Sequence, residues 1–146
     1  KSRAIHEYLR VLKPWGFLVM SPLTYHTQAP QKIIDDVGEI IGTTIKPMTT
    51  QDWVNIVGEI SKDFEFYFSE PYRLSPRTNE EVDAHVDYFL RKDRIKILSE
   101  TVRDAIKRRW WSTLKVFNEN HKYLGYSIIV FRKRSVVEEP ELFIST

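Results

Sequence analysis

The spacing of apolar residues predicts a helix at the start of the chain and a strand after it. The first apolar positions recur at intervals of three and four residues: Ile5, Tyr8, Leu9 and Leu12. Pro14 marks where this helix must end, because proline cannot continue the hydrogen-bond ladder. Phe17 to Met20 is a compact apolar run between Gly16 and Ser21-Pro22, which predicts a strand buried on both faces. Helix, turn and buried strand together form half of an α/β unit.

Two more helices and a second strand are predicted in the middle of the chain. Apolar residues keep helical spacing over 33–41, with Pro30 in the first turn and Gly42 as the cap at the end. Another helix opens near Thr49 or Thr50, whose hydroxyl can cap it, with Asp52 in its first turn. A strand is predicted next, because three phenylalanines alternate with other residues: Phe64, Phe66 and Phe68. Pro71 and Pro76 end this strand.

The last part of the chain is predicted to be helical and then to finish with a strand. From Asn79 to Phe117 the apolar positions follow a helical period, in one broken helix or two consecutive helices. Residues 118–122 form a polar turn, and Tyr123 to Phe131 is rich in β-branched and aromatic residues, which predicts the closing strand.

Composition excludes several classes of protein and site. The 146 residues, 42% of them hydrophobic, are about the size of one globular domain. Twenty-two basic and 20 acidic residues leave a formal charge of +2, so no strong field argues for nucleic acid or an anionic membrane. The absence of cysteine excludes disulfides, thiolate metal sites and a cysteine nucleophile. No run approaches the roughly 20 apolar residues of a membrane span, and we predict a cytoplasmic protein.

One segment resembles a motif of a known enzyme family. Residues 7–21 read EYLRVLKPWGFLVMS and resemble E-x-x-R-V-L-K-P-G-G-x-L-x-x-S, which joins the fourth helix to the fifth strand in class I S-adenosylmethionine-dependent methyltransferases, especially the quinone-biosynthesis type. Trp15 replaces the first glycine of the motif, so this position takes an ordinary backbone conformation or the turn is altered. Residues 50–53 resemble the start of the helix before strand six, and residues 123–133 resemble strand seven.

The resemblance implies an α/β fold that forms the C-terminal half of a Rossmann-like class I methyltransferase. Its mixed sheet has strand seven antiparallel between strands five and six, and a helical insertion at about 78–119 precedes the last strand. Residues 1–134 would be this C-terminal part of the methyltransferase domain, and residues 135–146 a C-terminal tail. The chain begins at Lys1 directly in a helical pattern, so we expect that upstream sequence has been removed.

The cofactor implied by the resemblance is S-adenosylmethionine in the complete protein, but its binding loop is missing from this chain. The only glycines are Gly16, Gly38, Gly42, Gly58 and Gly125, and none forms a Gly-x-Gly turn between a strand and a helix. We therefore predict no cofactor-binding residues here and an isolated chain that is inactive. The chain would supply the half that shapes the pocket of a small-molecule substrate, and its partner would be the missing N-terminal half or a second copy.

Five residues are candidates for substrate contact, whereas the catalytic residues stay unknown. Tyr25 and His26 follow a buried strand, at the sheet edge where open α/β folds bind ligands, and His26 could accept a proton at neutral pH. The alternative is an ordinary surface histidine. Tyr72 and Arg73 lie just beyond the sixth strand, where the family often contacts substrate. Trp111 lies opposite the apolar stripe of its helix, as a pocket lid or interface anchor.

A second hypothesis is a non-catalytic binding or assembly module that uses the helical insertion. Residues 107–111, Lys-Arg-Arg-Trp-Trp, mix basic and aromatic side chains as nucleic-acid surfaces do. The run is short, so nucleic acid is an unlikely partner, and packed or solvated side chains explain it more simply. Glu138, Glu139 and Glu141 have no histidine or aspartate at ligand spacing, so we predict no metal.

Overall fold

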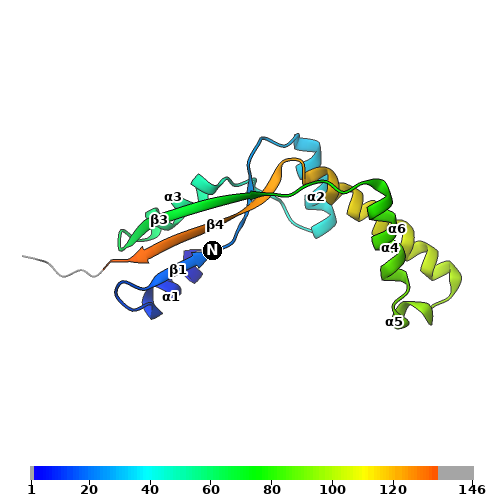
Figure 1. Ribbon diagram of the computed structural model, residues 1–146, viewed down its shortest axis with the longest axis horizontal. Coiled ribbons are helices and arrows are strands. Elements are labelled where there is room, and N and C mark those ends of the chain that lie inside the picture. Colours follow the sequence, from blue (N-terminus) through cyan, green and yellow to red (C-terminus); the bar gives the residue numbers. More distant parts are fainter. Residues whose placement is uncertain (1, 135–146) are drawn as a thin grey trace, which may run out of the picture. The chain divides into compact units, whose positions relative to one another are not determined.

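The computed structural model describes residues 2–134, which divide into two compact units (Figure 1). The first unit contains residues 2–22, 49–71 and 127–134, and the second contains residues 23–48 and 72–126. The long strands β3 (Phe64–Arg73) and β4 (Leu124–Lys133) contribute residues to both units.

The first unit is built on strand β4, with one strand on each of its edges. β1 (Phe17–Met20) pairs antiparallel with β4, from Phe17 opposite Arg132 to Met20 opposite Ile129. β3 also pairs with β4. The backbone N–H of Arg134 donates to the carbonyl of Asp63 at 2.7 Å, and the side chain of Arg132 binds Glu65 at 2.8 Å. In these two contacts the residue number in β4 decreases as that of its partner in β3 increases, so the two strands are antiparallel. The predicted arrangement, with the last strand antiparallel between the other two, is confirmed.

Helices α1 (Ser2–Val11) and α3 (Thr50–Ile60) pack against each other and supply the apolar core of this unit. The core residues come from both helices and all three strands: Ile5, Leu18, Val57, Phe64, Ile129 and Phe131. The predicted start of α3 is also confirmed. The Thr49 hydroxyl accepts from the backbone N–H of Asp52 at 3.2 Å, and the Asp52 carboxylate accepts from the backbone N–H of Thr49 at 2.7 Å.

Strand β1 is buried on one face, which corrects the prediction that both of its faces are buried. Leu18 lies in the core, but the side chains of Phe17 and Val19 are 51% and 62% exposed. Tyr67, whose ring meets that of Phe17 edge to face at 5.4 Å, is also 56% exposed. Successive side chains of a strand point to opposite faces, and the core formed with α1 and α3 takes up only the Leu18 side. Local hydrophobicity predicted the strand but not how many of its faces are covered.

The second unit contains a short strand where the sequence predicted a ligand-binding loop. β2 (Leu23–Tyr25) pairs antiparallel with β4, from Leu23 opposite Tyr126 to Tyr25 opposite Leu124. Tyr25 is buried with Ile34 and Leu124 in an apolar cluster. Three residues were too few to show a period in the sequence, so this strand was missed.

Strand β3 continues through Pro71, which corrects the prediction that this proline ends it. The strand extends to Arg73, and the backbone N–H of the following residue, Leu74, donates to the carbonyl of Leu124 at 3.2 Å. Proline is tolerated where a strand has a free edge, because its missing N–H then costs no ladder bond. In the part of the chain that the structure describes, β3 pairs with β4 alone, so it has such an edge.

The remaining helices belong to the second unit. α2 (Gln31–Ile41) ends at Gly42, whose φ of 72° is in the left-handed region that favours glycine. α4 (Asn79–Leu90), α5 (Asp93–Lys96) and α6 (Glu100–Asn120) follow, so the predicted helical segment before the last strand is present, with a short helix at its break. α6 packs on both α2 and α4.

Candidate functional site

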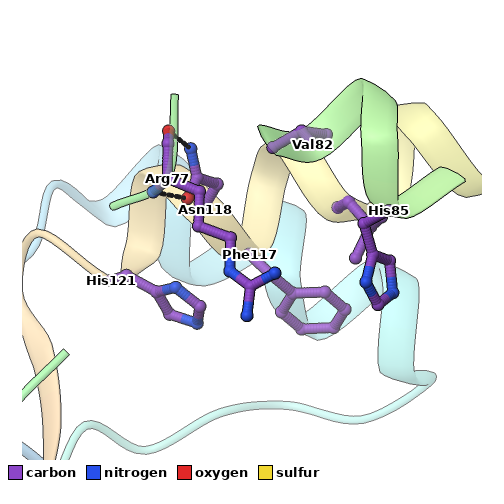
Figure 2. Close-up of a pocket in the computed structure, with 7 residues that line it drawn as sticks. Arg77, Val82, His85, Phe117, Asn118 and His121 are labelled. Atoms are coloured by element: carbon purple, nitrogen blue, oxygen red, sulfur yellow. Dashed lines mark hydrogen bonds between the residues drawn. The ribbon is translucent and has the colours of Figure 1, made fainter. Parts of the chain in front are cut away.

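A cavity of about 190 Å³ lies where the start of α4 meets the end of α6, within the second unit (Figure 2). Its walls are largely apolar, with one arginine, two histidines and one asparagine among them: Arg77, Val82, His85, Leu114, Phe117, Asn118 and His121. An apolar pocket with a few convergent polar groups is the usual form of a small-molecule site.

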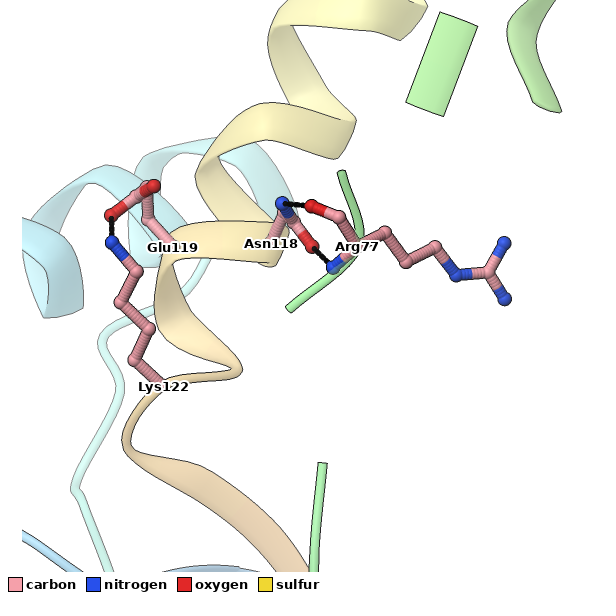
Figure 3. A network of polar contacts seen from close by, with 4 residues as sticks. All are labelled: Arg77, Asn118, Glu119 and Lys122. Atoms are coloured by element: carbon pink, nitrogen blue, oxygen red, sulfur yellow. Dashed lines mark hydrogen bonds and ion pairs between the residues drawn. The ribbon is translucent and has the colours of Figure 1, made fainter. Parts of the chain in front are cut away.

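Arg77 is held in place through its backbone by Asn118 of α6 (Figure 3). The Arg77 N–H donates to Asn118 Oδ1 at 2.7 Å, and Asn118 Nδ2 donates to the Arg77 carbonyl at 2.8 Å. The guanidinium itself takes no part in this pair. In Figure 2 it is drawn between the ring of Phe117 and the imidazole of His121. Arg77 is exposed, so its side chain is accessible.

The local sequence explains why Arg77 directly precedes a helix. The Thr78 hydroxyl accepts from the backbone N–H of Glu81 at 3.3 Å, and the Glu81 carboxylate accepts from the backbone N–H of Thr78 at 2.8 Å. This capping box starts α4 at Asn79. The Thr-x-x-Glu spacing was visible in the sequence and could have located Arg77 at the helix entry, but nothing local indicated that Asn118 would meet it.

His121, at the end of α6, has a pKa lowered from its ordinary value of 6.5. Burial is the larger cause, since it penalises the charged imidazolium, and the positive charge of Arg77 adds to it. The imidazole of His121 is therefore neutral at pH 7. His85 projects from α4 into the same cavity wall, so two imidazoles and one guanidinium face the space.

Tyr25 and His26 do not line this cavity. The Tyr25 hydroxyl donates to Asn120 Oδ1 at 3.2 Å, in a buried bond that ties β2 to the end of α6. The backbone N–H of His26 donates to the Tyr123 carbonyl at 3.0 Å, while its buried Nδ1 has no hydrogen-bond partner among residues 2–134. Tyr25 thus packs within the second unit, and a substrate role for Tyr25 and His26 stays a prediction.

The other three candidates also lie outside the cavity. The ring of Tyr72 stacks on Tyr126 with centroids 4.9 Å apart and planes 8° from parallel, and Arg73 is exposed. Trp111 Nε1 donates to Asp83 Oδ1 at 2.6 Å, so this indole joins α6 to α4. Substrate contact by these residues stays a prediction.

The basic and aromatic run of α6 is largely engaged within the second unit. Lys107 pairs with Asp87 of α4 at 3.2 Å, and Trp110 lies 5.2 Å from Phe89 between ring centroids. Together with the Trp111–Asp83 bond, these contacts place Lys107, Trp110 and Trp111 in the packing of α6 on α4. Arg108 and Arg109 are exposed, and the expectation that nucleic acid is an unlikely partner stays a prediction.

The five glycines of the described residues lie within helices, in a strand or in turns. Gly42 caps α2, and Gly125 lies in β4 against the Tyr72 carbonyl, where an added Cβ would clash. Gly16 is in the turn before β1, where a Cβ would meet the carbonyl of Lys13. None of these glycines lies between a strand and the start of a following helix, as a dinucleotide-type loop requires.

In residues 2–134, no three histidine, aspartate or glutamate side chains are placed so that they could hold one metal ion. The acidic residues Glu138, Glu139 and Glu141 lie outside the described residues, as does the predicted tail. No helix in the described part of the chain is long and apolar enough to span a bilayer.

No protein-family model matches the chain. An uncharacterized protein of Haemophilus influenzae is 32% identical over 78 residues, which are 53% of this chain and 31% of that protein. The crystal structure of the MccD protein superposes with a TM-score of 0.74 at 22% identity, over 91% of this chain and 54% of that one. The chain adopts a class I methyltransferase-like fold.

Two further solved structures share this fold. A S-adenosylmethionine-dependent methyltransferase from Geobacter sulfurreducens, in complex with S-adenosylhomocysteine, matches with a TM-score of 0.60 at 12% identity, over 92% of this chain and 52% of that one. The [4+2]-cyclase SpnF matches with a TM-score of 0.55 at 22% identity, over 91% of this chain and 44% of that one. The chain therefore spans about half the length of these proteins, and the fold alone does not define the reaction.

Proposed function

We propose that this chain is the substrate-facing C-terminal part of a cytoplasmic S-adenosylmethionine-dependent methyltransferase that acts on a small molecule. The observation that carries the proposal is the sheet: β4 runs antiparallel between β1 and β3, as the resemblance of residues 7–21 and 123–133 implies. The likeness in fold to the Geobacter sulfurreducens methyltransferase supports the same reading.

The helical segment before β4 supplies the proposed acceptor pocket. The cavity between α4 and α6, about 190 Å³, has room for a small molecule. In methyl transfer the protein contributes mainly positioning and exclusion of water, and walls formed by Val82, Leu114 and Phe117 suit both tasks.

The cofactor residues would come from outside this chain. Strand β1 pairs with β4 on one edge only, in the part of the chain that the structure describes, and Phe17 and Val19 expose apolar surface beside the other edge. An unpaired strand edge with apolar neighbours recruits another strand. We propose that the missing N-terminal half, or a second copy, occupies it.

Calorimetry with S-adenosylmethionine tests this proposal. The isolated chain should bind the cofactor at best weakly, because it lacks the glycine-rich turn. The full-length polypeptide that carries this chain should bind it and transfer a labelled methyl group to a small acceptor. Micromolar affinity of the chain alone, about −8 kcal/mol, would contradict the assignment of the cofactor site to the missing half. Failure of the full-length polypeptide to bind the cofactor would refute the methyltransferase proposal itself.

A further inference from the structure

We propose that the cavity between α4 and α6 binds a molecule that joins an anionic group, a carboxylate or a phosphate, to a small apolar body, with Arg77 as the residue that binds the anion. This inference rests on the proposed function in so far as the molecule is the methyl acceptor. The binding itself does not depend on the cofactor.

The size and lining of the cavity define the apolar body. Val82, Leu114 and Phe117 supply aliphatic and aromatic walls around about 190 Å³. An apolar cavity of about 150 Å³ holds one benzene molecule. The space between α4 and α6 is therefore suited to a single ring or a short branched chain with one substituent.

The charges around the cavity define the polar group. None of its seven lining residues is acidic, and among residues 2–134 no carboxylate forms an ion pair with the Arg77 guanidinium. A guanidinium presents parallel N–H donors that match two oxygens of a carboxylate or phosphate. A cation beside an apolar wall, without an internal counter-ion, is complementary to an anion attached to an apolar group.

The backbone of Arg77 is already ordered before any ligand arrives. Its N–H and carbonyl are both bonded to Asn118, and the capping box of Thr78 and Glu81 fixes the next residue. Binding then has to order only the arginine side chain, which lowers the entropic cost of association.

His121 provides a reporter for the bound anion. The positive charge of Arg77 disfavours the imidazolium of His121 and contributes to its lowered pKa. An anion at Arg77 would offset that charge and add an attraction of its own, so occupancy should raise the pKa of His121. An uncharged ligand of the same shape would lack both effects.

The test is an NMR titration of the chain at low salt, with the methyl groups of Val82 and Leu114 and the imidazole of His121 as probes. Benzoate and phenyl phosphate present the two anions on the same ring, benzamide is the neutral match of benzoate, and inorganic phosphate lacks the ring. We expect saturable methyl shifts with benzoate or phenyl phosphate, with a Kd on the order of 1 mM for so small a ligand, and a raised His121 pKa. The probe that binds more tightly shows whether the site prefers a carboxylate or a phosphate.

Two substitutions that each remove one positive charge distinguish a specific contact with Arg77 from a general effect of net charge. Arg77→Gln should weaken binding of the anionic probe about three- to tenfold, as expected for a partly exposed charge-assisted contact, and should reduce the rise in the His121 pKa on binding, because only the direct attraction of the anion remains. Arg94→Gln removes an exposed arginine that does not line the cavity and should leave affinity unchanged. The methyl spectrum of each variant without ligand verifies that the fold is intact.

Benzamide binding as tightly as benzoate, an equal loss in both variants, or no saturable shift with either aromatic anion would overturn the inference. Inorganic phosphate that binds as well as phenyl phosphate would remove the role of the apolar walls and overturn it too. Methyl transfer by the full-length polypeptide to neutral acceptors only would contradict this inference but leave the proposed function intact. If the full-length polypeptide bound the anion but not the cofactor, this inference would stand and the proposed function would be refuted.

Discussion

The two units of the chain are stabilised in different ways. The first unit has a continuous apolar core shared by α1, α3 and three strands, in which Ile129 and Val57 are fully buried. In the second unit α6 is 21 residues long, yet its buried residues are Thr113 and Asn120. That helix contacts its surroundings through partly buried rings, such as Trp110 against Phe89, and through polar contacts, such as Asn118 to Arg77.

This difference indicates that the first unit is a stable scaffold, whereas the second unit provides the candidate site. Close-packed apolar cores are rigid and leave few voids, whereas regions with fewer buried apolar contacts open more readily and commonly provide ligand sites. The cavity at Arg77 lies in the second unit, at the junction of two helices that share few buried apolar residues. Substitutions in each unit can test whether the contrast in packing is also a contrast in stability.

The largest effect is expected from truncating the core of the first unit. Phe131 is 2% exposed and contacts the rings of Phe64 and Phe66. Phe131→Ala should lower the free energy of unfolding by about 3 to 5 kcal/mol, from lost apolar burial and the cavity left behind. Urea denaturation followed by circular dichroism measures the change.

Val19→Ala is the matched control, because Val19 lies in the same sheet but is 62% exposed. Its effect should stay within about 0.5 kcal/mol. Similar losses for both variants would contradict the contrast in burial between Phe131 in the core and Val19 on the exposed face of β1.

A smaller effect is expected at the polar contacts of the second unit, where adjacent tryptophans form a natural pair. Trp111 Nε1 donates to Asp83 at 2.6 Å, whereas the buried Nε1 of Trp110 has no partner among the described residues. Both Trp→Phe changes remove similar apolar area. Trp111→Phe also removes a hydrogen bond to a charged group, so it should cost about 1 kcal/mol more than Trp110→Phe.

Native-state hydrogen exchange in α4 and α6 is the suitable measurement for this pair, since it reports the local opening of these helices. Trp111→Phe should speed exchange in both helices more than Trp110→Phe does. Equal exchange in the two variants would mean that packing, and not the Trp111–Asp83 bond, joins α6 to α4.

The smallest effect is a pH dependence from His121. Because its pKa is lowered in the folded state, the unfolded chain binds more protons at pH values between the folded pKa and 6.5. Stability should therefore fall as the pH falls through this window and level off below the folded pKa.

The difference between the native chain and His121→Gln isolates this contribution from the other histidines. The variant should show a shallower loss of stability between pH 7 and pH 5 in urea denaturation. Arg77→Gln should also flatten the dependence, because the second cause of the lowered pKa is removed. An unchanged slope in His121→Gln would show that the titration of this imidazole does not contribute to the pH dependence of stability.

Local chemistry in the sequence determined most elements of the fold. The helical period gave α1, α2 and α3, the Thr49 cap and the left-handed Gly42 were recognisable from residue type, and alternation gave β3. These features depend on neighbours within a few residues, so they are legible without a structure. The order of the strands came from the family resemblance of residues 7–21 and 123–133, not from periodicity.

Tertiary structure alone decided the candidate site. Arg77 and Asn118 are 41 residues apart in the sequence, and His121 joins them only because α6 returns along α4. It also decided that Tyr25 is buried against Asn120 and that β1 is covered on one face. The physical reason is the same in each case: a sequence period shows which side chains share a face, but only packing determines which faces meet and what space remains between them.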